Sequence, residues 1–174
     1  SPLTLDVIVP LNTDTGICAG SSATIDLQAS GGNGVYTYYQ QPDLVNPITL
    51  PVVVQPIATN TYDFVVIDGC STPLATASST ISVYSVPIVD FEADEPSGCQ
   101  PHGVIFTDLT NPTPLSWEWN FGDPDSGNNT SFDQNPNHAF SQPGEYDVTL
   151  TVESAEGCTA ELTYADLIEV FPPP

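Results

Sequence analysis

Short runs of β-branched and aromatic residues, in which apolar and polar positions alternate, recur along most of the chain. Residues 24–27 and 80–83 show the alternation most clearly, and Gly, Pro, Asn and Ser bound the runs. A period of two is typical of strands buried on one face. Strands at this spacing, with turn signals between them, predict an all-β chain of sandwich type.

The expected strands cover residues 4–9, 23–29, 35–40, 48–54, 61–67 and 79–84 in the first half, and 89–93, 103–108, 116–121, 146–153 and 161–170 in the second. The last is ambiguous, because residues 160–167 also suit a helical turn.

Charge is distributed very unevenly. The 174 residues contain no Lys or Arg and 22 Asp or Glu, six of them before Pro87 and sixteen after it, which gives a formal net charge of −22. Such a chain cannot neutralise phosphates, so nucleic acid and anionic lipid are excluded as partners. Trypsin-like proteases find no cleavage site here, which would suit life outside a cell; biased composition or salt adaptation is the alternative explanation.

The shift in acidity predicts two modules, residues 1–87 and 88–174, joined at a Pro-containing stretch and ending in a Pro-rich linker. Each module is expected to be an immunoglobulin-like β-sandwich with one disulfide. A module of this size is marginal without such a staple.

Four cysteines fall two to each half: Cys18 and Cys70, then Cys99 and Cys158. Of the three connectivities that four cysteines permit, pairing within each half respects the domain boundary. Each bridge would contribute about 4 kcal/mol in the chain-entropy model. Disulfides indicate an oxidising compartment, so we expect an extracellular or periplasmic protein. The chain shows no signal-like start and no run of 18 apolar residues, as expected for a processed fragment that does not insert into a membrane.

The two halves share a layout in which a Tyr-Asp pair opens a late strand before the second cysteine. Tyr62 and Tyr146 occupy these positions. In sandwiches a tyrosine here can bond its hydroxyl to nearby backbone, an arrangement called a tyrosine corner, so both residues are expected to have a structural duty.

The second half carries three linked motifs: WEWNFGD at residues 117–123, NPNHAF at 135–140 and PGEYDVTLTV at 143–152. Together they resemble the PKD (polycystic kidney disease) domain pattern over residues 88–171, in the cysteine-bearing variety common in Bacteroidetes surface proteins. The sequence departs from the pattern at Pro124, where a glycine is usual, and at Phe140, where tyrosine is more frequent. The resemblance implies a structural role for Trp117, Trp119, Phe121, Gly122, Asp123, His138, Gly144 and Tyr146.

The first half resembles the immunoglobulin-like repeats of gliding-motility and cell-surface adhesins from the same bacteria. The matching segments are GICAGS at residues 16–21, SGGNGVYTY at 30–38 and TYDFVVIDGC at 61–70. This resemblance implies a module strung in a long cell-surface chain.

One loop concentrates oxygen ligands: Asp123, Asp125, Asn128 and Asn129. It lacks the acidic spacing of an EF-hand, so a specific Ca²⁺ site and an ordinary turn both remain open, together with diffuse cation binding to the carboxylates. No cofactor is required by any motif.

Catalysis is not expected. His102 and His138 are the chain's two imidazoles, and a G-x-S-x-G elbow is absent. Trp117 and Trp119 share one face of a strand, and one or both are expected to pack against a Cys99–Cys158 bridge, whereas exposed rings would indicate carbohydrate recognition.

The sequence therefore leaves three possible functions, each from a different class. The first is a non-catalytic structural and adhesive segment of a bacterial cell-surface stalk, whose partners are neighbouring modules or other copies. The second is an accessory module of a secreted hydrolase that binds glycan or protein. The third is a filament subunit in which residues 3–9 complete the sheet of another copy.

Overall fold

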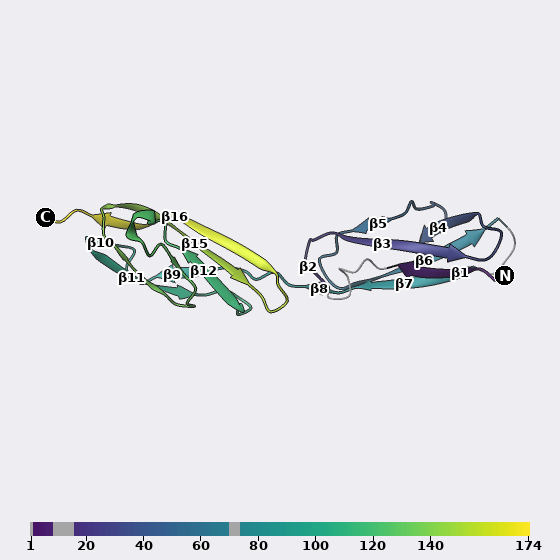
Figure 1. Cartoon of the computed structure of the whole chain (residues 1–174), viewed down its shortest axis with the longest axis horizontal. Coiled ribbons are helices and arrows are strands. Elements are labelled where there is room, and N and C mark those ends of the chain that lie inside the picture. Colours follow the sequence, from purple (N-terminus) through teal and green to yellow (C-terminus); the bar gives the residue numbers. More distant parts are fainter. Residues whose placement is uncertain (1, 9–15, 70–73) are drawn as a thin grey trace. The chain divides into compact units, whose positions relative to one another are not determined.

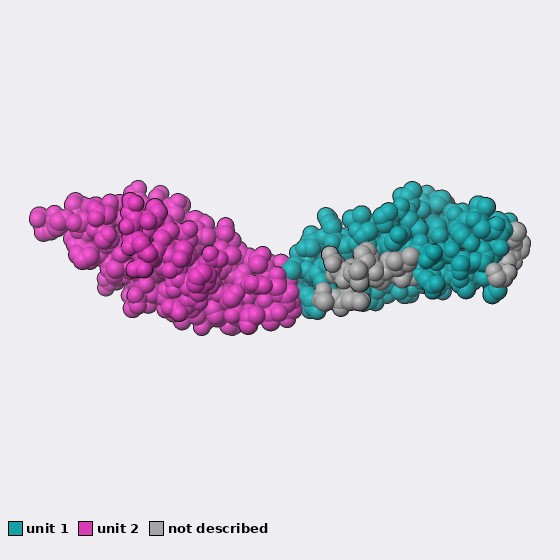
Figure 2. Space-filling model, in the orientation of Figure 1, with its two compact units in different colours: residues 1–85 teal, residues 86–174 magenta. Residues whose placement is uncertain are grey.

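The computed structural model describes residues 2–8, 16–69 and 74–174. It is built from strands and one short 3-10 helix, and it divides into two compact units, Ser1–Ser85 and Val86–Pro174 (Figures 1 and 2). The chain is all-β, as the alternating pattern predicts. The units divide two residues before the boundary that the sequence suggests.

The first unit packs one three-stranded sheet, in the order β1-β3-β5, against another in the order β4-β6-β7, with a parallel β2-β8 pair at the side. Its strands are β1 (Thr4–Ile8), β2 (Ile17–Cys18), β3 (Ala23–Ser30), β4 (Tyr36–Gln40), β5 (Val52–Val54), β6 (Asn60–Asp68), β7 (Ala75–Ile81) and β8 (Val83–Tyr84).

The core of the first unit follows directly from the alternation. Ile25, Phe64, Val66 and Ile81 are completely buried, and Leu5 of β1 lies with them in the same core. Strand β1 pairs with β3 of its own unit, from Thr4 opposite Ser30 to Ile8 opposite Asp26. The N-terminal strand is therefore part of this unit's own sheet and core.

The second unit packs a five-stranded sheet, in the order β10-β16-β15-β12-β13, against a three-stranded sheet in the order β14-β11-β9. Its elements are β9 (Phe91–Ala93), β10 (Ser97–Cys99), β11 (His102–Asp108), β12 (Ser116–Asn120), η1 (Pro124–Ser126), β13 (Thr130–Ser131), β14 (Asn137–Phe140), β15 (Gly144–Glu153) and β16 (Thr159–Phe171).

The helical turn considered for residues 160–167 is wrong. These residues belong to β16, which pairs with β15 over nearly its whole length, from Glu153 opposite Thr159 to Gly144 opposite Val170. A register shift between Tyr146 and Val148 breaks the ladder, and Asp166 beside it has a positive φ of 52°. This irregularity disturbs the period of two, which explains why the segment does not read as one strand.

The predicted disulfide between Cys99 and Cys158 is also wrong. Cys99 is exposed and free, whereas Cys158 is buried and disulfide-bonded. Cys99 pairs with Phe171 at one end of β16, and Cys158 directly precedes Thr159 at the other end. At about 3.3 Å per residue the two cysteines lie about 40 Å apart, far beyond the roughly 7 Å between Cα atoms that a disulfide can span.

In the first unit Cys18 is disulfide-bonded. The predicted partner, Cys70, lies outside the described residues. The predicted Cys18–Cys70 bond is nonetheless wrong, because with Cys99 free it would leave no cysteine to pair with the disulfide-bonded Cys158.

The state of Cys99 can be measured directly. We expect a thiol reagent such as N-ethylmaleimide to modify Cys99 in the native, unreduced protein, because this thiol is exposed. Peptide mass spectrometry locates the adduct, and Cys99→Ser is the control that removes it. An unmodified Cys99, or a peptide linking Cys99 to Cys158, would contradict the structure.

Candidate functional site

The motif residues of the second unit form its aromatic core. Trp119 and Phe121 are completely or almost completely buried, and the Trp119 ring lies 5.0 Å from Phe91 and 5.6 Å from Phe106 between ring centroids. The Trp119 Nε1 donates to the Asp133 carbonyl over 2.9 Å, so its polar atom is satisfied. Trp119 therefore packs against aromatic rings, and the predicted packing against a Cys99–Cys158 bridge does not occur.

His138 forms a buried pair with Asp123. The His138 Nε2 lies 3.1 Å from the Asp123 Oδ2, and both side chains are only 4% exposed. Phe121 stacks on the imidazole at 4.4 Å, while Phe140 meets it edge-on at 4.6 Å. The pair links the loop after β12 to β14, so its geometry suits a structural cross-link between the two sheets.

The loop that follows Phe121 uses its own polar atoms. The Asn129 Oδ1 accepts from the Asp123 backbone N–H at 2.6 Å, and its Nδ2 donates to the Asn120 Oδ1 at 3.0 Å. The Asp123 carbonyl accepts from the Ser126 hydroxyl at 2.8 Å. Asp123 and Asn129 are thus engaged within the loop.

Asp125 and Asn128 are exposed members of the same loop. Within residues 2–8, 16–69 and 74–174 there is no group of three or more His, Cys, Asp or Glu side chains that could hold a metal ion. The loop has the internal hydrogen bonds of a turn.

His102, the second imidazole, is buried in the same unit. Its Nε2 lies 2.8 Å from the Glu95 carbonyl oxygen. Both imidazoles therefore have hydrogen-bond partners in the interior of the unit. His138 also lines a second pocket, of about 360 Å³, together with Ser126 and Ser131.

One of the two motif glycines, Gly122, occupies a position that a side chain would disturb. Gly122 has a φ of 66°, and a Cβ there would collide with the backbone of Asp147 on β15. Gly144 opens β15 with the Tyr146 ring beside it.

The Tyr146 hydroxyl donates to the Gln142 carbonyl at 2.8 Å, which is a tyrosine corner. Burial, and then the nearby charges of Asp123 and Asp125, raise the pKa of the Tyr146 phenol. Tyr62 packs against the core of the first unit, but no bond from its hydroxyl is found in the described part of the chain.

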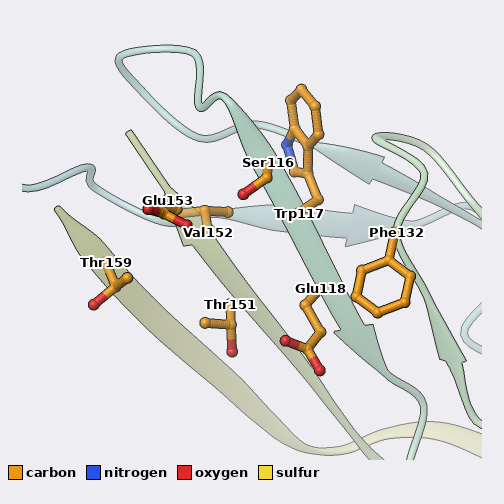
Figure 3. Close-up of a pocket in the computed structure, with 8 residues that line it drawn as sticks. All are labelled: Ser116, Trp117, Glu118, Phe132, Thr151, Val152, Glu153 and Thr159. Carbon is orange, nitrogen blue, oxygen red and sulfur yellow. The ribbon is translucent and has the colours of Figure 1, made fainter. Parts of the chain in front are cut away.

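A pocket of about 190 Å³ opens on the outer side of the five-stranded sheet (Figure 3). Its lining comes from three strands of the sheet and from the residue after β13: Ser116, Trp117, Glu118, Phe132, Thr151, Val152, Glu153 and Thr159. Sequence reasoning singled out Trp117 and missed the others. Alternation along β12 could have placed Ser116 and Glu118 on the outer face, but Phe132 lies in no strand and gave no signal.

The His138–Asp123 pair can be tested by removing one partner. We expect Asp123→Ala to lower the free energy of unfolding by about 1–3 kcal/mol, because it leaves a buried imidazole nitrogen without its partner. Urea denaturation measures the change.

Asp125→Ala is the matched control, since it removes a carboxylate from the same loop at an exposed position. It should change the stability by less than about 0.5 kcal/mol. Equal losses in the two variants would mean that the His138–Asp123 bond contributes nothing specific.

The Tyr146 phenol gives a pH dependence. Its pKa is raised in the folded state, so its contribution to stability is complete below the unfolded value near pH 10 and is lost as the pH rises through the folded value. We expect the free energy of unfolding to fall above about pH 10, and to fall less steeply in Tyr146→Phe. Denaturation at a series of pH values measures both slopes, with Tyr39→Phe as a control; parallel curves for wild type and Tyr146→Phe would contradict the assignment.

Comparison with known proteins gives a match to a family model for the PKD domain at residues 85–170. The PKD1 domain of the Vibrio cholerae metalloprotease PrtV and the PKD1 domain of Vibrio anguillarum Epp are each 24% identical, with a TM-score of 0.40 over 49% of this chain and 96% of that one. The ectodomain of mouse nectin-like molecule 4 is 12% identical, with a TM-score of 0.41 over 97% of this chain and 64% of that one. No curated protein matches the chain.

Proposed function

We propose that this chain, whose residues 85–170 form a PKD domain, is a non-catalytic structural and adhesive segment of a bacterial cell-surface protein. Its two sandwiches would hold other parts of the parent chain away from the surface and contact partners outside the cell. Neighbouring modules of the same chain are its first expected partners.

The buried His138–Asp123 pair carries this proposal. A His–carboxylate pair is the arrangement most readily recruited for proton transfer, but here it is 4% exposed on both sides and is flanked by Phe121 and Phe140. A general base must come within hydrogen-bond reach of a substrate proton. The burial of the pair supports a structural role for it, as does the aromatic core that its motif builds.

Disulfide bonding supports an extracellular location. Cys18 and Cys158 are both disulfide-bonded, as is typical of oxidising compartments. In the described residues no helix is long and apolar enough to cross a membrane.

The two alternative functions have less support. An accessory glycan-binding module would display a row of exposed aromatic rings, yet Tyr36, Tyr38 and Trp117 pack against the cores, and Phe132 stands alone at the pocket. A filament built by strand addition would need a donor strand, and β1 is already paired with β3.

The exposed thiol of Cys99 offers a test of location in cells that make the parent protein. We expect a membrane-impermeant maleimide to label Cys99 on intact cells, and Cys99→Ser to remove this label. Labelling that appears only after lysis would overturn the cell-surface proposal.

A second arm tests adhesion. Deleting residues 1–174 from the parent chain should reduce cell attachment, because the segment is proposed to mediate adhesion. Export should stay unchanged, because the segment is proposed to have no other activity. An equal attachment of deleted and intact cells, or a hydrolytic activity that disappears with the segment, would contradict the proposal.

A further inference from the structure

The pocket on the five-stranded sheet combines one exposed aromatic ring, that of Phe132, with two carboxylates. Trp117 borders the pocket but packs against the core, where its Nε1 donates to the Asp108 Oδ2 over 2.8 Å. Phe132, by contrast, is 70% exposed. Figure 3 shows the Phe132 ring and the Glu118 side chain from neighbouring segments of the same pocket wall.

The strand register places the carboxylates around one threonine. Glu118 lies opposite Thr151, and Ser116 lies opposite Glu153, so Glu118 and Glu153 are diagonal neighbours on the outer face. Side chains in this relation are within reach of one group placed between them. The pocket therefore presents two negative charges to a single occupant.

Neither carboxylate is neutralised by the chain itself. The Thr151 hydroxyl donates to Glu161 at 3.0 Å and not to Glu118. No hydrogen bond or ion pair to the carboxylates of Glu118 or Glu153 is found in the described part of the chain, and the full sequence has no Lys or Arg that could supply one.

This charge and this exposed ring suit one class of occupant. A guanidinium or ammonium group can lie against an aromatic ring and bond a carboxylate at the same time, and Arg does both with its planar fork. A neutral ligand would cover the ring but would leave both charges unbalanced.

We propose that the pocket of Trp117, Glu118, Phe132 and Glu153 binds an arginine or lysine side chain of a partner protein. The basic group must come from outside these 174 residues, because they contain no Lys or Arg and a second copy of the segment cannot supply one. The inference deepens the proposed adhesive function by giving the chemistry of the partner, and it rests on that function.

The test uses the whole 174-residue chain and a fluorescein-labelled peptide in which Arg and Gly alternate. We expect fluorescence anisotropy to report binding that weakens with added salt, and amide NMR to place the largest shifts at residues 116–118 and 151–153. The same peptide with citrulline in place of Arg keeps the shape without the charge, and it should not bind.

Paired variants separate a pocket from a diffuse negative surface. Glu118→Gln with Glu153→Gln should weaken peptide binding at least about tenfold, and Phe132→Ser, at an exposed position, should also weaken it. Glu145→Gln with Glu169→Gln is the matched control, because these glutamates are directly opposite each other on β15 and β16 and lie outside the pocket. The control should change the affinity by less than about threefold.

Equal weakening by the two double variants would overturn the pocket and indicate general electrostatic attraction. No binding of the Arg peptide, equal binding of the citrulline peptide, or shifts at the pocket with cellohexaose instead would also overturn it. These outcomes are independent of the maleimide labelling on cells, so failure of this inference is distinguishable from failure of the cell-surface proposal.

Discussion

Burial of apolar surface is the interaction on which both units depend, because the chain has no basic side chain with which to form an ordinary salt bridge. In the second unit this burial centres on Trp119, which is completely buried among Phe91, Phe106 and Phe121. Aromatic rings bury the largest area for each residue and add directional contacts to it. The same rings enclose His138, so the hydrophobic core also gives the buried His138–Asp123 hydrogen bond its low-dielectric surroundings.

Much of the strand pattern could be predicted because burial of one face gives each strand an alternation of apolar and polar residues in its sequence. Strands β3, β6, β11, β12 and β15 were all anticipated to within two residues. The short strands β2, β10, β13 and β14 were not, because two to four residues are too few to show a period. The prediction that Cys99 pairs with Cys158 failed for a different reason. The distance between the two cysteines depends on which end of β16 each one neighbours, and this is set by the strand register.

The candidate pocket was harder to predict than the fold. Its parts come from β12, β15, β16 and the residue after β13, and only the register brings Glu118 and Glu153 together across two strands. Trp117 was expected in the core, and it does pack there, but one side of it also borders the pocket. The sequence motifs point toward residues that build the interior of the unit. Residues of the outer face alternate with them along the same strands and belong to no recognised pattern.

The length of β16 has a mechanical consequence. Its thirteen residues pair with β15 along one side, and its C-terminal end pairs in parallel with β10 on the other. A pull on the chain beyond Phe171, directed along the strand, would load these hydrogen bonds in shear, so that many must break together. An opening from the end, one bond at a time, would need a pull at right angles to the strand. The pairing of β16 would therefore resist a pull along the strand more strongly than a pull across it.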